Sequence, residues 1–153
     1  RSGDGVIHGT GCAVNGYYSE DERTIFVERA SAEQRRLFEV MLRAQEAAIA
    51  AVRPGVPCRE VDRAARSVIE DAGLGEAFIH RTGHGIGIDY HELPFFAPSD
   101  ETVLAPGMVM SVEPGIYVPG AGGFRHSDTI VVTEEGCEVL TPYPKDLESL
   151  IVG

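Results

Sequence analysis

Two segments with helical periodicity are enclosed on both sides by sequence that is typical of β-strands. The first starts at Ser31, which forms a capping-box pattern with Gln34, and it stops before Pro54. The second runs from about Arg59 to Ala72, with Gly73 as its C-terminal cap. The apolar positions of the two segments are Leu37, Val40, Met41, Ala44, Ala48 and Val52, then Val61, Ala65, Val68 and Ile69. Two consecutive helices between blocks of strands predict an α+β domain.

The flanking segments predict an antiparallel sheet. Before the helices, Asn15-Gly16 supplies the positive φ angles of a tight hairpin within the stretch Val6–Glu28. The returning strand, Arg23–Val27, is rich in β-branched and aromatic residues. After the helices, short strands are expected around Met108–Glu113 and Thr129–Glu134 as parts of a meander. We therefore expect helices packed on one face of a curved antiparallel sheet.

The amino-acid composition and the net charge of the chain argue against some classes of function. The chain has 153 residues, with 24 acidic and 13 basic side chains, a net charge of −11 and a pI near 4.8. A nucleic-acid or anionic-membrane partner is not expected, because a phosphate backbone needs a basic surface. The three cysteines (Cys12, Cys58, Cys137) form no CxxC motif. They predict a reducing, cytoplasmic setting, with the cysteines as small core residues.

The N-terminal sequence predicts that the chain is a fragment of a longer protein. Residue 1 is Arg rather than Met, and the apolar stretch at Val6 follows almost at once, without a cap or a turn. A first strand that begins this early usually has neighbours upstream. The alternative is that only a tag and the initiator methionine were removed.

Histidine placement is the strongest chemical signal. Four of the five histidines (His80, His84, His91 and His126) fall within one stretch of 47 residues, and the first three lie in a glycine-rich segment. Glycines on both sides of His84 let backbone approach its side chain closely. A lone histidine is usually structural, but three in such a loop favour a ligand role, as in a metal site or an oxyanion site.

Two further residues carry chemistry. Glu113 ends an apolar strand just before Pro114-Gly115, so we expect it to project into a cavity. Burial would raise its pKa unless a cation or a hydrogen-bond donor compensates. Such a residue suits a metal ligand or a general acid/base. Arg125 could bind a substrate carboxylate through its planar fork or form a structural salt bridge, and the sequence leaves both open.

At these residues the chain resembles the creatinase/prolidase/aminopeptidase P family, the pita-bread hydrolases. The stretches that carry the likeness are Thr82–Glu92, Gly107–Gly115 and Asp128–Glu134, and the likeness covers essentially all 153 positions. The resemblance implies a pita-bread fold, with a curved sheet that holds the active site. It implies that residues 1–153 are a single C-terminal catalytic domain whose N-terminal part is missing, and it makes a homodimer the expected assembly.

The resemblance also implies a departure at the metal site. Metallopeptidase members hold two divalent metals between two aspartates, a histidine and two glutamates. In chain order these positions match Gly9, Glu20, His84, Glu113 and Ser127. Gly9 and Ser127 supply no carboxylate, so a complete two-metal site is not expected. One divalent metal (Zn, Mn or Co) held by Glu20, His84 and Glu113 is the alternative, with His126 as a further nitrogen donor.

A site without a cofactor is the first expectation, as in creatinase. Gly16-Tyr17-Tyr18 and Gly122–Arg125 resemble the creatinase versions of these segments. In this interpretation His84 is the proton shuttle, and the cationic part of a substrate occupies the space of the metals. A nearby carboxylate such as Glu113 should raise the pKa of His84.

The leading hypothesis is hydrolysis of a C–N bond in a small amino-acid-like, guanidino or peptide substrate. The expected site residues are His84, Glu113 and His91 for catalysis, and His80, Arg125 and His126 for substrate binding. One alternative is a metal-dependent Xaa-Pro dipeptidase or aminopeptidase with one metal. The other is a binding module that has lost its catalytic activity.

Overall fold

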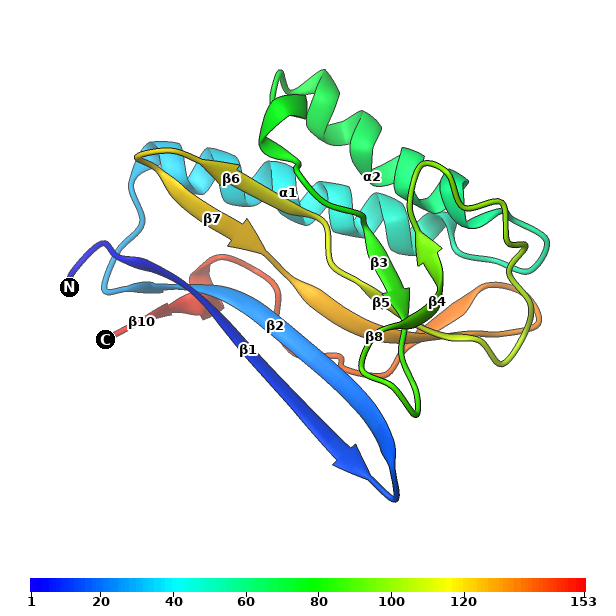
Figure 1. The fold of residues 1–153 in the computed structure, drawn as a ribbon. Helices are drawn as coiled ribbons and strands as arrows, with labels where there is room; N and C mark the ends of the chain where they lie inside the picture. The colour runs from blue at the N-terminus through cyan, green and yellow to red at the C-terminus, as the bar shows by residue number, and fades with distance from the viewer.

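The computed structural model describes all 153 residues and consists of a curved, mostly antiparallel sheet with two helices on one face (Figure 1). The strand order in this sheet is β1 (Gly5–Val14), β2 (Tyr17–Val27), β8 (Ser127–Val132), β5 (Val109–Val112), β3 (Gly83–Gly85) and β4 (Glu92–Phe96). Two short strands extend it: β9 (Cys137–Val139) pairs with β8, and β10 (Ile151–Val152) runs parallel to β2. A separate ribbon is formed by β6 (Gly115–Val118) and β7 (Gly122–Arg125). Short 3-10 turns cover Gly75–Ala77 and Glu148–Leu150.

The predicted hairpin is confirmed. Asn15 and Gly16 have φ angles of 53° and 87°, and Val14 faces Tyr17 across the turn. Strand β1 is the free edge of the sheet, and Ile7 is its only residue that is not exposed. The tip of the β1–β2 hairpin extends away from the helices (Figure 1).

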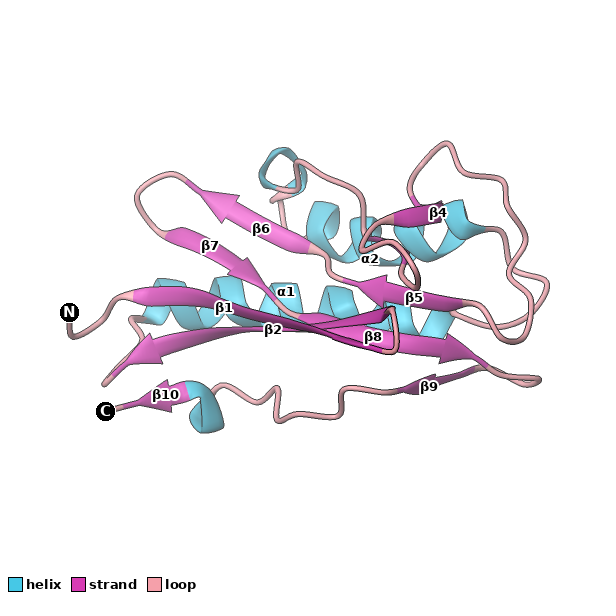
Figure 2. Cartoon of the chain, turned by 60° about the horizontal axis from the view of Figure 1, so that its bottom comes forward, coloured by secondary structure: helices cyan, strands magenta, loops and turns pink.

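The two predicted helices are confirmed to within a residue or two. Helix α1 spans Ala32–Ala51, and both hydrogen bonds of the Ser31–Gln34 capping box form. Helix α2 spans Cys58–Asp71 and is followed by Gly73 with a φ of 73°. Both helices lie behind the sheet in Figure 2.

The core lies between the helices and the sheet. Its centre is an aromatic group in which the Phe26 ring is 6.1 Å from that of Phe38 and 6.3 Å from that of Phe124. All three rings are essentially inaccessible to solvent. This packing joins α1 to β2 and β7 and fixes the strands that carry the polar residues described below.

The prediction for the part of the chain that follows the two helices is only partly right. Strands β5 and β8 lie where strands were expected, but the β6–β7 ribbon separates them along the chain, so they do not form a simple meander. The histidine-rich stretch was expected to be a loop, yet it contains β3, which pairs with both β4 and β5. A three-residue strand with two glycines has no β-propensity signal. It forms because a Cβ at Gly83 would overlap the backbone carbonyl of Ser111 on β5, so only glycine permits this approach.

The cysteine prediction needs a correction. All three cysteines are free thiols, but only Cys58 is buried; Cys137 is half-buried and Cys12 is exposed on β1. Cys12 lies on an edge strand with no packing layer over it, so it is not a core residue. No helix has both the length and the apolar character that crossing a bilayer requires.

Candidate active site

Three side chains from three strands or their ends converge at the centre of the sheet. His84 lies on β3, Glu20 lies on β2, and Glu113 follows β5. The Nε2 atom of His84 is 3.3 Å from Oε1 of Glu113 and 3.6 Å from Oε1 of Glu20. One donor atom from each residue lies within 4.8 Å of the others. The structure thus brings together three residues that were predicted from the sequence, the outermost of which are 93 positions apart in the chain.

The His84 ring is held on one side and unpartnered on the other. Its Nδ1 is 2.9 Å from the carbonyl oxygen of Gly85, an arrangement in which Nδ1–H donates. Its Nε2 is buried and has no hydrogen-bond partner. The side chain is fully inaccessible to solvent. In the neutral ring, Nε2 therefore presents a free lone pair between two carboxylates.

The pKa of His84 is raised and the pKa of Glu113 is lowered from their ordinary values. Burial alone would lower the pKa of His84, but the contact with the Glu113 carboxylate, the Gly85 carbonyl and the charge of Glu20 outweigh it, so the pKa is raised above 6.5. Burial would raise the pKa of Glu113, yet contact with His84 and the charge of Arg125 lower it below 4.5. The expected rise in the pKa of His84 is confirmed, and Glu113 has the compensating cations that keep it ionised.

Glu20 and Ser127 stand at two positions that match metal ligands of the metallopeptidase members, and a hydrogen bond joins them. Glu20 is 5% exposed, and its Oε1 accepts a bond of 2.7 Å from the Ser127 hydroxyl. Ser127 faces Glu22 across the β2–β8 pair. The space beside Gly9 is taken by the same Glu22, whose Oε1 would lie 2.9 Å from a Cβ at position 9.

Arg125 is already paired within the protein. Its Nε and Nη2 donate to the two carboxylate oxygens of Glu22 at 2.5 and 2.6 Å. Its Nη1 is 3.4 Å from the Tyr117 hydroxyl and 3.7 Å from Oε2 of Glu113. Of the two roles that the sequence left open, the salt bridge is the one that the structure contains.

His80 and His91 lie beside the cluster. The Nδ1 of His80 is 2.7 Å from the Arg81 carbonyl, and its Nε2 is 3.0 Å from the Tyr117 hydroxyl. The ring of His91 is 4.1 Å from that of His84, centre to centre. Burial, followed by the positive charges of His84 and Arg81, lowers the pKa of His91.

His126 does not belong to this group, which corrects its expected role. It is fully buried beneath α1, with its ring 5.0 Å from that of Phe38. Its Nε2 points to the carbonyl of Lys145 at 3.4 Å. Burial and the charge of Arg23 lower its pKa to about 4. It therefore contacts neither a substrate nor a metal at His84, because side chains alternate between the two faces of the chain where β7 passes into β8.

A cavity of about 370 Å³ opens over the cluster. Its lining residues are Glu20, Glu22, His80, Arg81, Tyr90, His91, Glu113 and Arg125. Glu22, Arg81 and Tyr90 were not predicted from the sequence to belong to the site. Strand alternation could have found Glu22, which lies two residues from Glu20 and so on the same face. Nothing in the local sequence of Arg81 or Tyr90 marks them.

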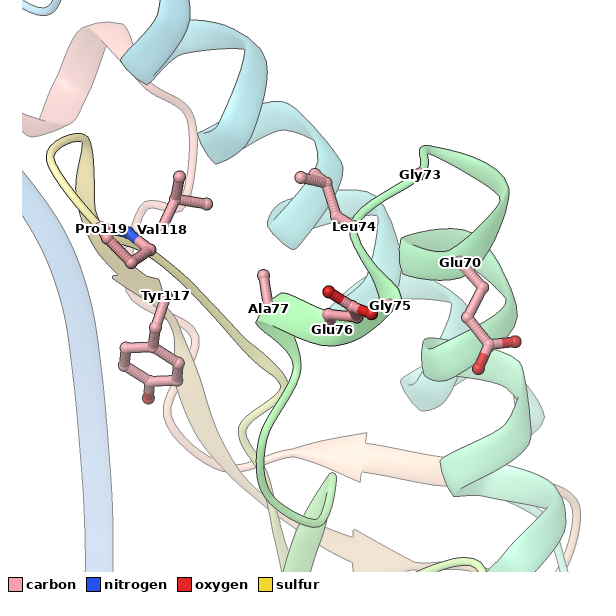
Figure 3. A pocket seen from close by; sticks show the side chains of 9 residues that line it. All are labelled: Glu70, Gly73, Leu74, Gly75, Glu76, Ala77, Tyr117, Val118 and Pro119. Carbon is pink, nitrogen blue, oxygen red and sulfur yellow. The ribbon is translucent and has the colours of Figure 1, made fainter.

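A second, wider depression of about 690 Å³ lies between the end of α2 and the β6–β7 ribbon (Figure 3). Its titratable side chains are Glu70, Glu76 and Tyr117, and it holds no histidine. It thus lacks a base beside a nucleophile or an acid, and the smaller cavity is the candidate active site.

The curved sheet, with two helices on one face and a buried histidine between two carboxylates at its centre, is the arrangement expected of the pita-bread fold. The model of metallopeptidase family M24 matches residues 1–134, and the chain belongs to this family.

Three relatives show which members of the family the chain is similar to. It is 43% identical over 145 residues to the Xaa-Pro dipeptidase of Pyrococcus furiosus, covering 95% of this chain and 42% of that protein. The structure of an Xaa-Pro dipeptidase from Bacillus anthracis matches with a TM-score of 0.95 and 44% identity, over 99% of this chain and 42% of that one. Dipeptidase PepE from Mycobacterium ulcerans matches with a TM-score of 0.93 and 45% identity, over 96% and 40%. The predicted pita-bread fold is confirmed, and the chain spans about two fifths of the length of these relatives.

Proposed function

We propose that the protein hydrolyses a C–N bond in a small amino-acid-like or short peptide substrate, with His84 as the proton shuttle and without a complete two-metal centre. One observation supports this above all others: the Nε2 of His84 is buried, unpartnered and flanked by two carboxylates that line a cavity. A group so placed can accept and return a proton without first breaking another hydrogen bond.

The proposed proton transfers use three of the predicted residues. Water attacks the carbon of the scissile bond, its proton passes to Nε2 of His84, and the C–N bond breaks as that proton reaches the leaving nitrogen. Glu113 holds the imidazolium by charge at 3.3 Å. His91, whose ring lies beside that of His84, would exchange protons with solvent because it is exposed.

The donor set argues against two metal ions. Two divalent cations bring four positive charges, and bridging carboxylates must neutralise most of them. At position 9 there is only glycine, and Glu22, which fills the adjacent space, is paired with Arg125. At position 127 there is a neutral hydroxyl, which is donating to Glu20.

A second candidate is a peptidase of the Xaa-Pro type with one metal, which the names of the relatives favour. The unpartnered Nε2 of His84, with Glu20 and Glu113, offers one nitrogen and two oxygen donors, a set that fits a single Zn²⁺ or Mn²⁺. A cation held there would supply Lewis-acid polarisation of the scissile carbonyl. A homodimer and a cytoplasmic location remain predictions for the protein.

Two measurements on the complete protein test the proposal. Elemental analysis after purification without chelators should find at most one divalent ion per chain; two would contradict the degenerate site. Turnover should then be measured with an Xaa-Pro dipeptide (Ala-Pro) and with a guanidino acid (creatine).

His84→Gln should lower kcat/KM on the accepted substrate by about 10²–10⁴-fold, the usual contribution of a general acid or base. His8→Gln, at an exposed histidine on β1, is the matched control and should leave turnover unchanged. Unchanged turnover in His84→Gln would exclude the shuttle. An absence of turnover with every substrate would favour a binding module.

A further inference from the structure

We propose that Arg81 is the anion-binding residue of the candidate active site and that it takes the carboxylate of a small zwitterionic substrate. The inference rests on the proposed function for one assumption, that the cavity above His84 receives such a substrate. Neither the motif-based analysis nor the resemblance to the family gives Arg81 a role.

The cavity is lined by two guanidinium groups, and only one of them is free. Arg125 forms a two-pronged pair with Glu22, the geometry that gives arginine its strongest carboxylate contacts. A substrate carboxylate could reach the same face of Arg125 only by displacing Glu22. The charge of Arg125 is therefore largely used within the protein.

Arg81 is in the opposite situation. It forms no salt bridge, although three glutamates line the same cavity. Its Nε is shielded from solvent and has no hydrogen-bond partner. A buried N–H of a charged group that lacks an acceptor is unfavourable. The guanidinium lines the cavity and pairs with no carboxylate of the protein, so a ligand carboxylate would supply the acceptor that it lacks.

The Arg81 side chain is also held in place for this task. Its Cζ lies 4.5 Å from the centre of the Phe95 ring, so the aromatic face supports the guanidinium while leaving its N–H edge free. The backbone is fixed on both sides: the Arg81 carbonyl lies 2.7 Å from Nδ1 of His80, and the next residue, Thr82, donates twice to buried Asp62, at 2.9 and 3.1 Å. A guanidinium held in this way loses little freedom when it binds.

The charges of the cavity match a zwitterion. Once Arg125 and Glu22 are paired, Glu20 and Glu113 remain as negative groups around His84, and Arg81 remains as the unpaired positive group. A ligand with a cationic nitrogen and a carboxylate would meet a complementary charge at each end. An amino acid or a short peptide has this pattern, and a neutral amide analogue has only half of it.

Calorimetric binding to the complete protein tests the inference, with L-proline and sarcosine as carboxylate probes and L-prolinamide as the neutral-ended control. Wild-type protein should bind the carboxylates more tightly than the amide. Arg81→Met should weaken binding of both carboxylates at least tenfold and change binding of L-prolinamide less than twofold. Arg81→Lys keeps the charge but loses the fork, and should fall between the two.

Arg63→Met is the matched control, because Arg63 is exposed on α2 and outside the cavity; its affinities should equal those of the wild type. If Arg81→Met unfolds, Arg81→Lys carries the test. Equal affinity of wild type and variant for L-proline would overturn the inference. So would a wild type that binds neither carboxylate, or that prefers the amide.

The outcome is separable from that of the proposed function. If Arg81→Met loses carboxylate affinity while His84→Gln keeps its turnover, the catalytic proposal fails and the role of Arg81 stands. If His84→Gln is inactive but the affinities of Arg81→Met are unchanged, the role of Arg81 fails and the catalytic proposal stands.

Discussion

Two groups of buried carboxylates lie on neighbouring strands of the same sheet, and they differ in how fully they are satisfied. The first surrounds Asp128 on β8, which is inaccessible to solvent. Its Oδ1 accepts from Arg23 at 2.7 Å and from Thr141 at 3.2 Å. Its Oδ2 accepts from Lys145 at 2.9 Å and from Gln45 at 3.1 Å. Every strong acceptor direction of this carboxylate is used inside the protein.

The second group surrounds His84 and is left incomplete. Two carboxylates face one imidazole nitrogen that has no hydrogen-bond partner, and the cavity gives ligands access to them. A satisfied buried network stabilises a fold, whereas a partly satisfied one is usually kept for binding or catalysis. Charge and burial alone therefore do not distinguish the two groups; what distinguishes them is that the carboxylates beside His84 line a cavity, whereas Asp128 is closed off inside the protein.

The largest expected effect is on the satisfied group. Asp128→Ala should lower the free energy of unfolding by about 3–5 kcal/mol, because Arg23 and Lys145 would lose their buried counter-charge. The loss can be measured by urea unfolding of the complete protein, with hydrogen exchange of the β8 amides to locate it. A change below about 1 kcal/mol would contradict the contrast between the two groups.

His126 provides a second test, which is the pH dependence of the free energy of unfolding. Its pKa is about 4 in the folded protein against 6.5 for an ordinary histidine, because burial and Arg23 disfavour the charged ring. Between these values the unfolded chain binds more protons, so stability falls as the pH falls from 6.5 to 4. The expected loss over this window is about 3 kcal/mol, at 1.36 kcal/mol per pH unit.

The measurement is the unfolding free energy of His126→Gln and of wild type across the same pH range. The variant should show a shallower decline with falling pH, and His8→Gln should follow the wild type. Parallel curves for wild type and His126→Gln would show that another group is responsible.

The smallest effect on stability is expected at the incomplete group. Glu113→Gln should change the free energy of unfolding by only about 1 kcal/mol, the usual size for a single substitution that leaves no large cavity. It should nevertheless lower the pKa of His84, since the contact with Glu113 is the main influence that raises it against burial. NMR titration of labelled histidines in the complete protein measures this pKa. A pKa of His84 that stays where it is in the wild type would show that the Gly85 carbonyl and Glu20, rather than Glu113, control the imidazole.

Much of the fold was predictable, because its signals are local. The Asn15-Gly16 turn and the capping box at Ser31 act within four residues, and both form as expected. Strand β3 was not predictable, because its pairing depends on glycines that allow close approach to β5, not on residues that favour strands.

The candidate site was predictable in its chemistry and less so in its connections. His84, Glu20 and Glu113 were selected from motif and resemblance, and they converge. Arg125 was selected for a substrate, yet its fork holds Glu22, 103 residues earlier in the chain. His126 was selected because it lies near other histidines in the chain, and it points to the opposite face.

The sequence by itself therefore determined where the helices and the hairpin begin and end, and which stretch carries the reactive imidazole, because these depend on neighbours within one or two turns of chain. Only the tertiary structure decided which cation meets which carboxylate. Those pairs depend on the register of β2 against β8 and on the β6–β7 ribbon, which bring residues about a hundred positions apart into contact. The approach of β7 to β2 is what pairs Arg125 with Glu22.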